Sequence, residues 1–150
     1  MTASNSQIEF QAAPTAPAAR GLSRPETGTA ADGVRVLLRL EGLAAFATAL
    51  ALYVHAGLSW PAFALFFLAP DLAMLAYLLG PRAGALGYNL AHTYVFALLL
   101  ALTGFFAGVP VAAAGGLIWA AHIGFDRALG YGLKYPTGFG DTHLGRTGRR

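Results

Sequence analysis

The sequence contains no cysteine, which excludes disulfide bonds, thiolate metal ligands and a cysteine nucleophile. Charged side chains are also scarce: Asp, Glu, Lys and Arg make up 11% of the 150 residues. About a quarter of the residues are charged in an ordinary soluble domain. Hydrophobic residues make up 56% of the chain. This balance is typical of a membrane protein, and the length predicts a single domain.

The net charge of +3 does not indicate nucleic-acid binding. The basic residues stand beside apolar segments and in one short loop, without the interleaved aromatic residues that bind single strands. We therefore expect no nucleic-acid partner, and we interpret these residues as topology signals that contact membrane lipid.

Residues 1–33 are rich in Ala, Pro, Ser, Thr and Gly and show no apolar periodicity. This composition predicts a disordered cytoplasmic tail. The tail has no apolar core of a signal peptide, so the first apolar segment is expected to direct membrane insertion.

Four apolar segments follow, each long enough to cross a hydrocarbon core of about 30 Å at about 1.5 Å per residue. The connections HAGLSW, GPR and AGVP are too short for anything except antiparallel neighbours. The predicted fold is all-α, an up-down-up-down four-helix transmembrane bundle over residues 34–132, followed by a basic cytoplasmic tail over 133–150. The segments are Val36–Val54, Pro61–Leu79, Ala83–Phe106 and Val109–Gly130.

Lys and Arg predict the orientation, because they concentrate in cytoplasmic flanks. The two remaining connections have no basic residue, so both termini and the middle loop are expected on the cytoplasmic side. The basic flanking residues are Arg20, Arg24, Arg35, Arg39, Arg82, Lys134, Arg146, Arg149 and Arg150.

Polar residues of the apolar segments fall at a common depth. Asp71, His92 and His122 each lie roughly eight or nine residues from the expected cytoplasmic end, which corresponds to about 12 Å. Glu41, Asn89 and Asp126 lie in a shallower layer on the same side. The pairs Asn89/His92 and His122/Asp126 are spaced to share one helix face. Ionisable groups at such depth are costly, which makes them candidates for a functional site.

Simpler roles are open for each residue. Glu41 and Asp126 are near enough to the interface to form salt bridges with Arg39, Arg82 or Arg127. Asn89 suits an interhelical hydrogen bond. The glycine-rich segment after residue 130 either covers the mouth of the bundle or lies on lipid.

Several motifs together resemble one family. The chain has Arg-Leu-Glu-Gly at 39–42, Pro-Asp at 70–71, Tyr-Asn-x-x-His-x-Tyr at 88–94 and His-x-Gly-x-Asp-Arg at 122–127, before Gly-Tyr-Gly-Leu-Lys-Tyr-Pro. Residues 36–149 resemble the small bacterial membrane proteins of the domain of unknown function family 4260. The resemblance implies a multi-pass protein of the bacterial inner membrane, and it implies no activity.

The residues support several functions. Asp71, His92 and His122 would suit zinc or iron(II) in a metal-dependent membrane enzyme, because imidazole and carboxylate are ligands for both ions. Asp126 or Glu41 would then orient a ligand or act as general base, with Asn89 and Arg127 as further polar groups, on an amphipathic lipid-like substrate. Haem binding by the two histidines, a proton or ion carrier, and a non-catalytic structural role remain alternatives.

Overall fold

The computed structural model describes residues 32–147 and is mainly helical. The all-α class is confirmed. The predicted N-terminal tail lies outside the described residues, except that Asp32 and Gly33 belong to the first helix. The elements are α1 (Asp32–His55), α2 (Trp60–Phe66), the 3₁₀ helix η1 (Ala69–Leu79), α3 (Pro81–Ala91), α4 (Tyr94–Phe106), α5 (Pro110–Leu129), β1 (Asp141–Thr142) and β2 (Gly145–Arg146).

Three helical segments of the described chain are long and apolar enough to cross a membrane: Asp32–His55, Trp60–Leu79 and Pro81–Phe106. The fourth predicted span, now α5, is not among them. The reason lies in its composition, since it is rich in Ala and Gly and carries His122, Asp126 and Arg127. α5 is instead the inner helix, and it packs against both α1 and α4.

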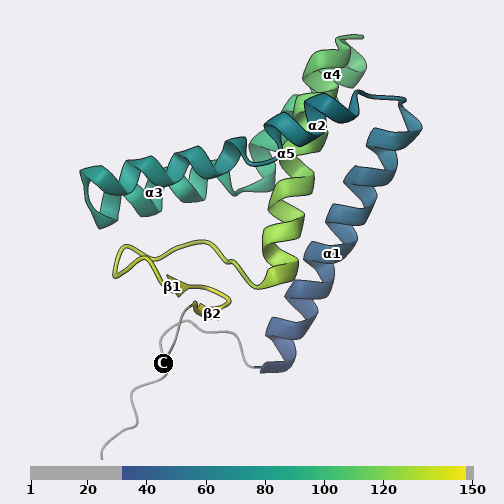
Figure 1. The fold of residues 1–150 in the computed structure, drawn as a ribbon. Helices are drawn as coiled ribbons and strands as arrows, with labels where there is room; N and C mark the ends of the chain where they lie inside the picture. The colour runs from purple at the N-terminus through teal and green to yellow at the C-terminus, as the bar shows by residue number, and fades with distance from the viewer. Residues whose placement is uncertain (1–31, 148–150) are drawn as a thin grey trace, which may run out of the picture.

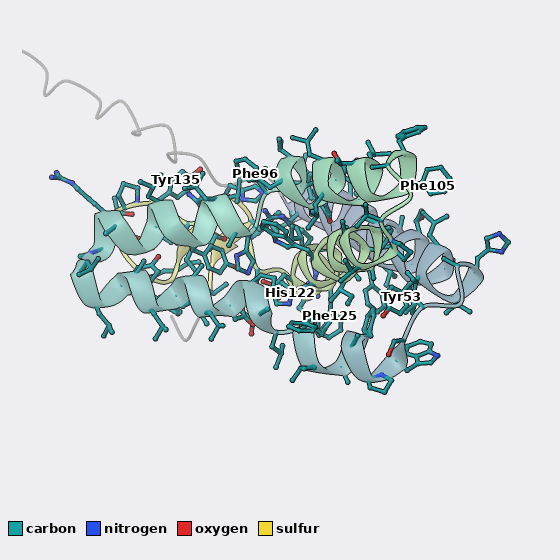
Figure 2. The ribbon with its side chains drawn as sticks, turned by 90° about the horizontal axis from the view of Figure 1, so that it is seen from above. Tyr53, Phe96, Phe105, His122, Phe125 and Tyr135 are labelled. Atoms are coloured by element: carbon teal, nitrogen blue, oxygen red, sulfur yellow. The ribbon has the colours of Figure 1, made fainter. Side chains whose placement is uncertain are left out.

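The second and third predicted segments are each divided into two helices. Pro70 has no N–H to continue the hydrogen bonds of α2, so α2 stops and η1 begins. α3 ends at Ala91 with His92 as its C-cap, and Thr93 is extended (ψ 138°) before α4. The η1–α3 hairpin therefore extends sideways from the packed α1, α4 and α5 (Figures 1 and 2).

Glycines bring the helices of the packed part very close together. A Cβ on Gly124 of α5 would lie 2.6 Å from the backbone nitrogen of Phe46 in α1. A Cβ on Gly116 would overlap the backbone of Ala101 in α4. Small residues permit this approach, which is common where helices pack inside membranes.

The segment after α5 folds back beneath the η1–α3 hairpin (Figure 1). β1 and β2 form a two-stranded antiparallel sheet, and Lys134 forms an isolated bridge with Thr142. The side-chain amide of Asn89 on α3 donates to the carbonyl of Lys134 (2.9 Å) and accepts from its N–H (2.7 Å). We call residues 130–147 the C-terminal segment, and α3 holds it in place through Asn89.

The docking of this segment is expected to weaken in acid. His143 Nδ1 accepts a hydrogen bond from the N–H of Leu133 (2.8 Å), and burial, aided by the charge of Arg127, lowers the pKa of His143. A lowered pKa means that the detached segment takes up protons more readily, so docking is stable above the ordinary histidine pKa of about 6.5 and weakens as the pH falls below it.

Hydrogen exchange at the amide of Leu133, corrected for its intrinsic rate, measures this effect. Protection should fall between about pH 7 and pH 5 in the wild type. His143→Gln, which cannot titrate there, should show little change over the same interval. An identical pH profile in both proteins would contradict the assignment to His143.

Candidate metal centre

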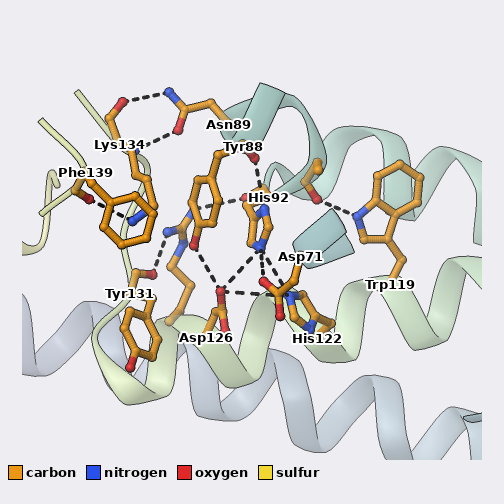
Figure 3. Close-up of polar contacts among 12 residues, drawn as sticks. Asp71, Tyr88, Asn89, His92, Trp119, His122, Asp126, Tyr131, Lys134 and Phe139 are labelled. Carbon is orange, nitrogen blue, oxygen red and sulfur yellow. Dashed lines mark hydrogen bonds and ion pairs between the residues drawn. The ribbon is translucent and has the colours of Figure 1, made fainter. Parts of the chain in front are cut away.

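Two histidines and two aspartates from three different helices converge where the η1–α3 hairpin meets α5. Asp71 comes from η1, His92 from the end of α3, and His122 and Asp126 from one face of α5. One ligand atom of each lies within 4.8 Å of those of the other three. Figure 3 shows the four side chains pointing toward one another, and we call them the His–Asp cluster.

Most of the separations between the ligand atoms are close to those of ligands around one ion. The two Nε2 atoms are 3.1 Å apart. His92 Nε2 lies 3.4 Å from an oxygen of Asp71 and 3.4 Å from an oxygen of Asp126. His122 Nε2 lies 3.5 Å from Asp71 and 3.9 Å from Asp126. A tetrahedral ion bound at about 2.0–2.2 Å holds its ligand atoms about 3.3–3.6 Å apart.

Direct hydrogen bonds explain these separations less well. Hydrogen bonds from a ring nitrogen to a carboxylate are about 2.7–2.9 Å long, so the four imidazole–carboxylate distances are too long for good ones. Only the separation of the two Nε2 atoms falls within hydrogen-bond range. The arrangement therefore fits a shared ion better than mutual hydrogen bonding.

The break between α3 and α4 positions His92. Its Nδ1 lies 2.9 Å from the carbonyl oxygen of Tyr88, which can only accept, so Nδ1 donates. This fixes the neutral tautomer in which the lone pair of Nε2 points into the cluster. The ring of Tyr88 stacks on the imidazole with centroids 3.7 Å apart. Metal-binding histidines are commonly oriented by such a hydrogen bond at the other ring nitrogen.

Side chains of α5 satisfy the carbonyls that the break leaves free. The indole N–H of Trp119 donates to the carbonyl of Ala91 (2.6 Å), and the guanidinium of Arg127 donates to that of His92 (3.0 Å). Unsatisfied backbone groups are costly at membrane depth, and irregular backbone there occurs where it lines a protein-enclosed site. Arg127, predicted as a further polar residue, thus supports the cluster through the backbone of His92.

Packing rather than hydrogen bonding orients His122. Its side chain is almost fully buried, with 1% exposed. Phe67 and His92 both contact it edge-on, at centroid distances of 5.4 and 5.1 Å. Its Nδ1 has no hydrogen-bond partner within residues 32–147, so Nε2 makes the polar contacts of this ring.

The two carboxylates differ in their surroundings. Asp126 is 14% exposed, and its Oδ2 accepts a hydrogen bond from the hydroxyl of Tyr88 (3.1 Å). Asp71 is 32% exposed, and its carboxylate contacts the two imidazoles. Asp126 is therefore the more fixed carboxylate, and Asp71 lies at the open side of the cluster.

The remaining candidates from the sequence lie elsewhere. Glu41 is exposed on α1 and is not a member of the cluster. Asn89 binds the backbone of Lys134 and does not face the four ligand atoms (Figure 3). The three residues expected in the shallower layer thus lie in three different places. Only Asp126 is part of the cluster.

Two residues that support the cluster, Tyr88 and Lys134, were not among the site residues predicted from the sequence. Tyr88 stacks on one member of the cluster and hydrogen-bonds another, and its spacing of four residues from His92 placed it on the same helix face. Lys134 is buried, and its ammonium lies 4.7 Å from the Tyr88 ring and 3.8 Å from the Phe139 ring. Burial lowers the pKa of Lys134, and the carboxylates of Asp126 and Asp71 partly oppose that effect.

Residues 35–147 match the family described as Domain of unknown function (DUF4260). The chain belongs to this family. The match spans every member of the His–Asp cluster and the C-terminal segment up to residue 147. No curated protein and no solved structure matches the chain.

Proposed function

We propose that this family member is a metal-dependent membrane enzyme that holds one divalent transition-metal ion in the His–Asp cluster. The observation that carries the proposal is the set of ligand separations, 3.1–3.9 Å, which suit one ion and are mostly too long for hydrogen bonds. Two imidazoles with carboxylates are ligands for zinc and for iron(II).

His92, His122 and Asp126 are the best-fixed ligands, and Asp71 is the more exposed one. A bound ion of this kind acts as a Lewis acid and lowers the pKa of a bound water toward neutrality. Asp71 at the open side is then placed as a displaceable ligand or as a general base. This proposal exchanges the roles that the sequence suggested for Asp71 and Asp126, because Asp126 is less exposed than Asp71 and accepts a hydrogen bond from Tyr88.

Elemental analysis of the full-length protein, purified in detergent without chelators, tests the proposal. The wild type should contain about one equivalent of zinc or iron, as expected for one tetrahedral site. His92→Ala should lose most of it, since loss of one ligand weakens the site strongly. Asp71→Asn should retain metal better than Asp126→Asn.

Two exposed residues provide matched controls. His55→Ala removes an exposed histidine at the end of α1, and Glu41→Gln removes the exposed carboxylate of the same helix. Both should retain the metal content of the wild type. Metal-free wild-type protein, or equal loss of metal in His92→Ala and His55→Ala, would refute the proposal.

We also infer that both termini lie on the cytoplasmic side of a bacterial inner membrane. The start of α1 and the C-terminal segment lie at one end of the molecule, and residues 56–59 and 107–109 lie at the other (Figure 1). Arg35, Arg39, Lys134 and Arg146 gather at the first end, as cytoplasmic flanks do.

Reporter fusions measure this topology. Fusions after Gly33 and Arg150 should report the cytoplasm, and fusions after Gly57 and Gly108 should report the opposite side. A fusion after Arg150 that reports the opposite side would contradict the orientation, whatever the metal content.

A further inference from the structure

An apolar pocket of about 370 Å³ lies next to the His–Asp cluster. One wall comes from the α2–η1 junction, with Phe66, Pro70 and Ala73. Gly115, Ile118 and Trp119 of α5 also line the pocket. The volume is within the range of small-molecule binding pockets, about 300–1,000 Å³.

The lining defines the chemistry of an occupant. It contains no charged side chain, and its polar hydrogen, the indole N–H of Trp119, is already donated to the carbonyl of Ala91. A polar ligand would lose its hydration here without gaining a hydrogen bond, which is unfavourable. A hydrocarbon chain has no hydrogen bonds with water to give up, so the apolar lining suits such a chain.

The position of the pocket connects it with the cluster. Pro70 precedes Asp71, and Ala91, which also lines the pocket, precedes His92. Trp119 lies one helical turn before His122 on the same face of α5. No member of the cluster lines the pocket itself. Neighbouring positions on η1, at the end of α3 and on α5 nevertheless contribute to both, so the pocket and the cluster adjoin.

The surroundings of the pocket indicate that a ligand enters it from the lipid rather than from water. Phe66 in its wall is 54% exposed, and its neighbours Leu68 and Leu72 are 62% and 67% exposed. These residues belong to Trp60–Leu79, a segment apolar enough to cross a membrane. In a bilayer such side chains face lipid tails rather than water.

We propose that the pocket binds one hydrocarbon chain of a membrane lipid and places the oxygen-bearing polar group of that lipid at the His–Asp cluster. This inference rests on the proposed metal function, because the metal is what receives the polar group. It names a membrane lipid as the substrate class of the site.

Trp119 provides a direct readout because it lines the pocket. The chain has two tryptophans. The test therefore uses full-length Trp60→Phe protein, in which Trp119 is the remaining one. The protein is reconstituted in phosphatidylglycerol bilayers, and a fatty acid with a brominated chain is added, since bromine quenches indole fluorescence on contact. Trp119 should be quenched at a low mole fraction of this probe.

Filling the pocket should prevent the quenching. Ala73→Phe fills it from the η1 side and Gly115→Leu from the α5 side, where a Cβ meets only Leu100 at 3.7 Å. Either change should reduce the quenching by about twofold or more, since a filled pocket excludes the chain. Ala64→Phe, exposed on α2 outside the pocket lining, is the matched control and should behave like its parent. Equal quenching in the filled variants and their parent would overturn the inference.

Metal content measured on the same samples separates this inference from the proposed function. If metal is bound but quenching is unaffected by filling, the lipid inference fails and the metal centre stands. If the protein is metal-free, the metal centre fails. Removal of metal by a chelator should weaken quenching by the brominated fatty acid, because its carboxylate loses its partner. Unchanged quenching after metal removal would overturn the placement of the polar group at the cluster.

Discussion

Removal of the bound metal with a chelator is expected to lower the free energy of unfolding by about 3–4 kcal/mol, when free metal had stood at 100 to 1,000 times its dissociation constant. The physical reason is that the ion binds the folded chain alone. Asp71 on η1, His92 at the end of α3, and His122 and Asp126 on α5 are together only when these helices are packed. Melting curves in detergent, with and without chelator, measure the difference.

His122→Ala should abolish this response to metal and chelator. The variant keeps three members of the cluster, but it loses the ligand that lies 3.1 Å from His92 Nε2. The variant should also lose stability without metal, because His122 is almost fully buried and packs against Phe67 and His92. The response to metal and chelator, rather than the absolute stability, is therefore the measured quantity. His55→Ala is the control and should respond to metal like the wild type.

The opposite result would show that the cluster only stabilises the packing of the helices by hydrogen bonds, without a metal. In that case the wild type is insensitive to chelator, and His122→Ala loses about 0.5–2 kcal/mol, as is usual for a hydrogen bond between membrane helices. His122→Gln then recovers part of the loss, because its amide can still donate to the carboxylates. Such a result would contradict the metal function directly.

The common depth of three residues could be predicted from the sequence, because depth along a helix depends only on counting. Asp71, His92 and His122 were expected in one layer, and the structure brings their ligand atoms together. Asp126 was assigned to a shallower layer by the same count. It nevertheless reaches the others because it is four residues from His122 on one face of α5, and side-chain length covers the difference.

Rotation about the helix axis could not be predicted by counting. On α1 the buried residues are Gly42, Ala49 and Tyr53, so this face meets the bundle. Glu41 is one residue from Gly42, about 100° away around the helix, and it points outward. The close contact at Gly42 and Gly124 decides this rotation, and a single sequence does not reveal which glycines of two helices will meet.

The helix breaks were only half predictable. Pro70 predicts an irregular second segment, since proline cannot donate a backbone hydrogen bond. Nothing comparable marks His92, where the helix ends without glycine or proline. Side chains distant in sequence stabilise this end, namely Trp119 and Arg127 on the carbonyls of Ala91 and His92. Such a break is a property of the tertiary structure.

Gly124→Ala is expected to destabilise the protein by about 1–3 kcal/mol, the usual cost of overpacking a tight contact. The new Cβ would lie 2.6 Å from the nitrogen of Phe46 and 2.8 Å from the oxygen of Gly42, and both are backbone atoms that cannot rotate away. α1 and α5 would have to separate, and His122 and Asp126, on either side of Gly124, would move with α5. A melting curve and the metal content measure both consequences.

Gly115→Ala is the matched control, because it makes the same chemical change in the same helix. A Cβ at Gly115 meets only Leu100, at an ordinary distance of 3.7 Å. Alanine is intrinsically better than glycine in a helix by up to about 1 kcal/mol, so this variant should be as stable as the wild type or more stable. If Gly124→Ala and Gly115→Ala were destabilised equally, the destabilisation would come from any substitution in α5. It would then not come from the contact between α5 and α1. A stable, metal-loaded Gly124→Ala would show instead that the two helices do not approach as closely as Gly42 and Gly124 allow.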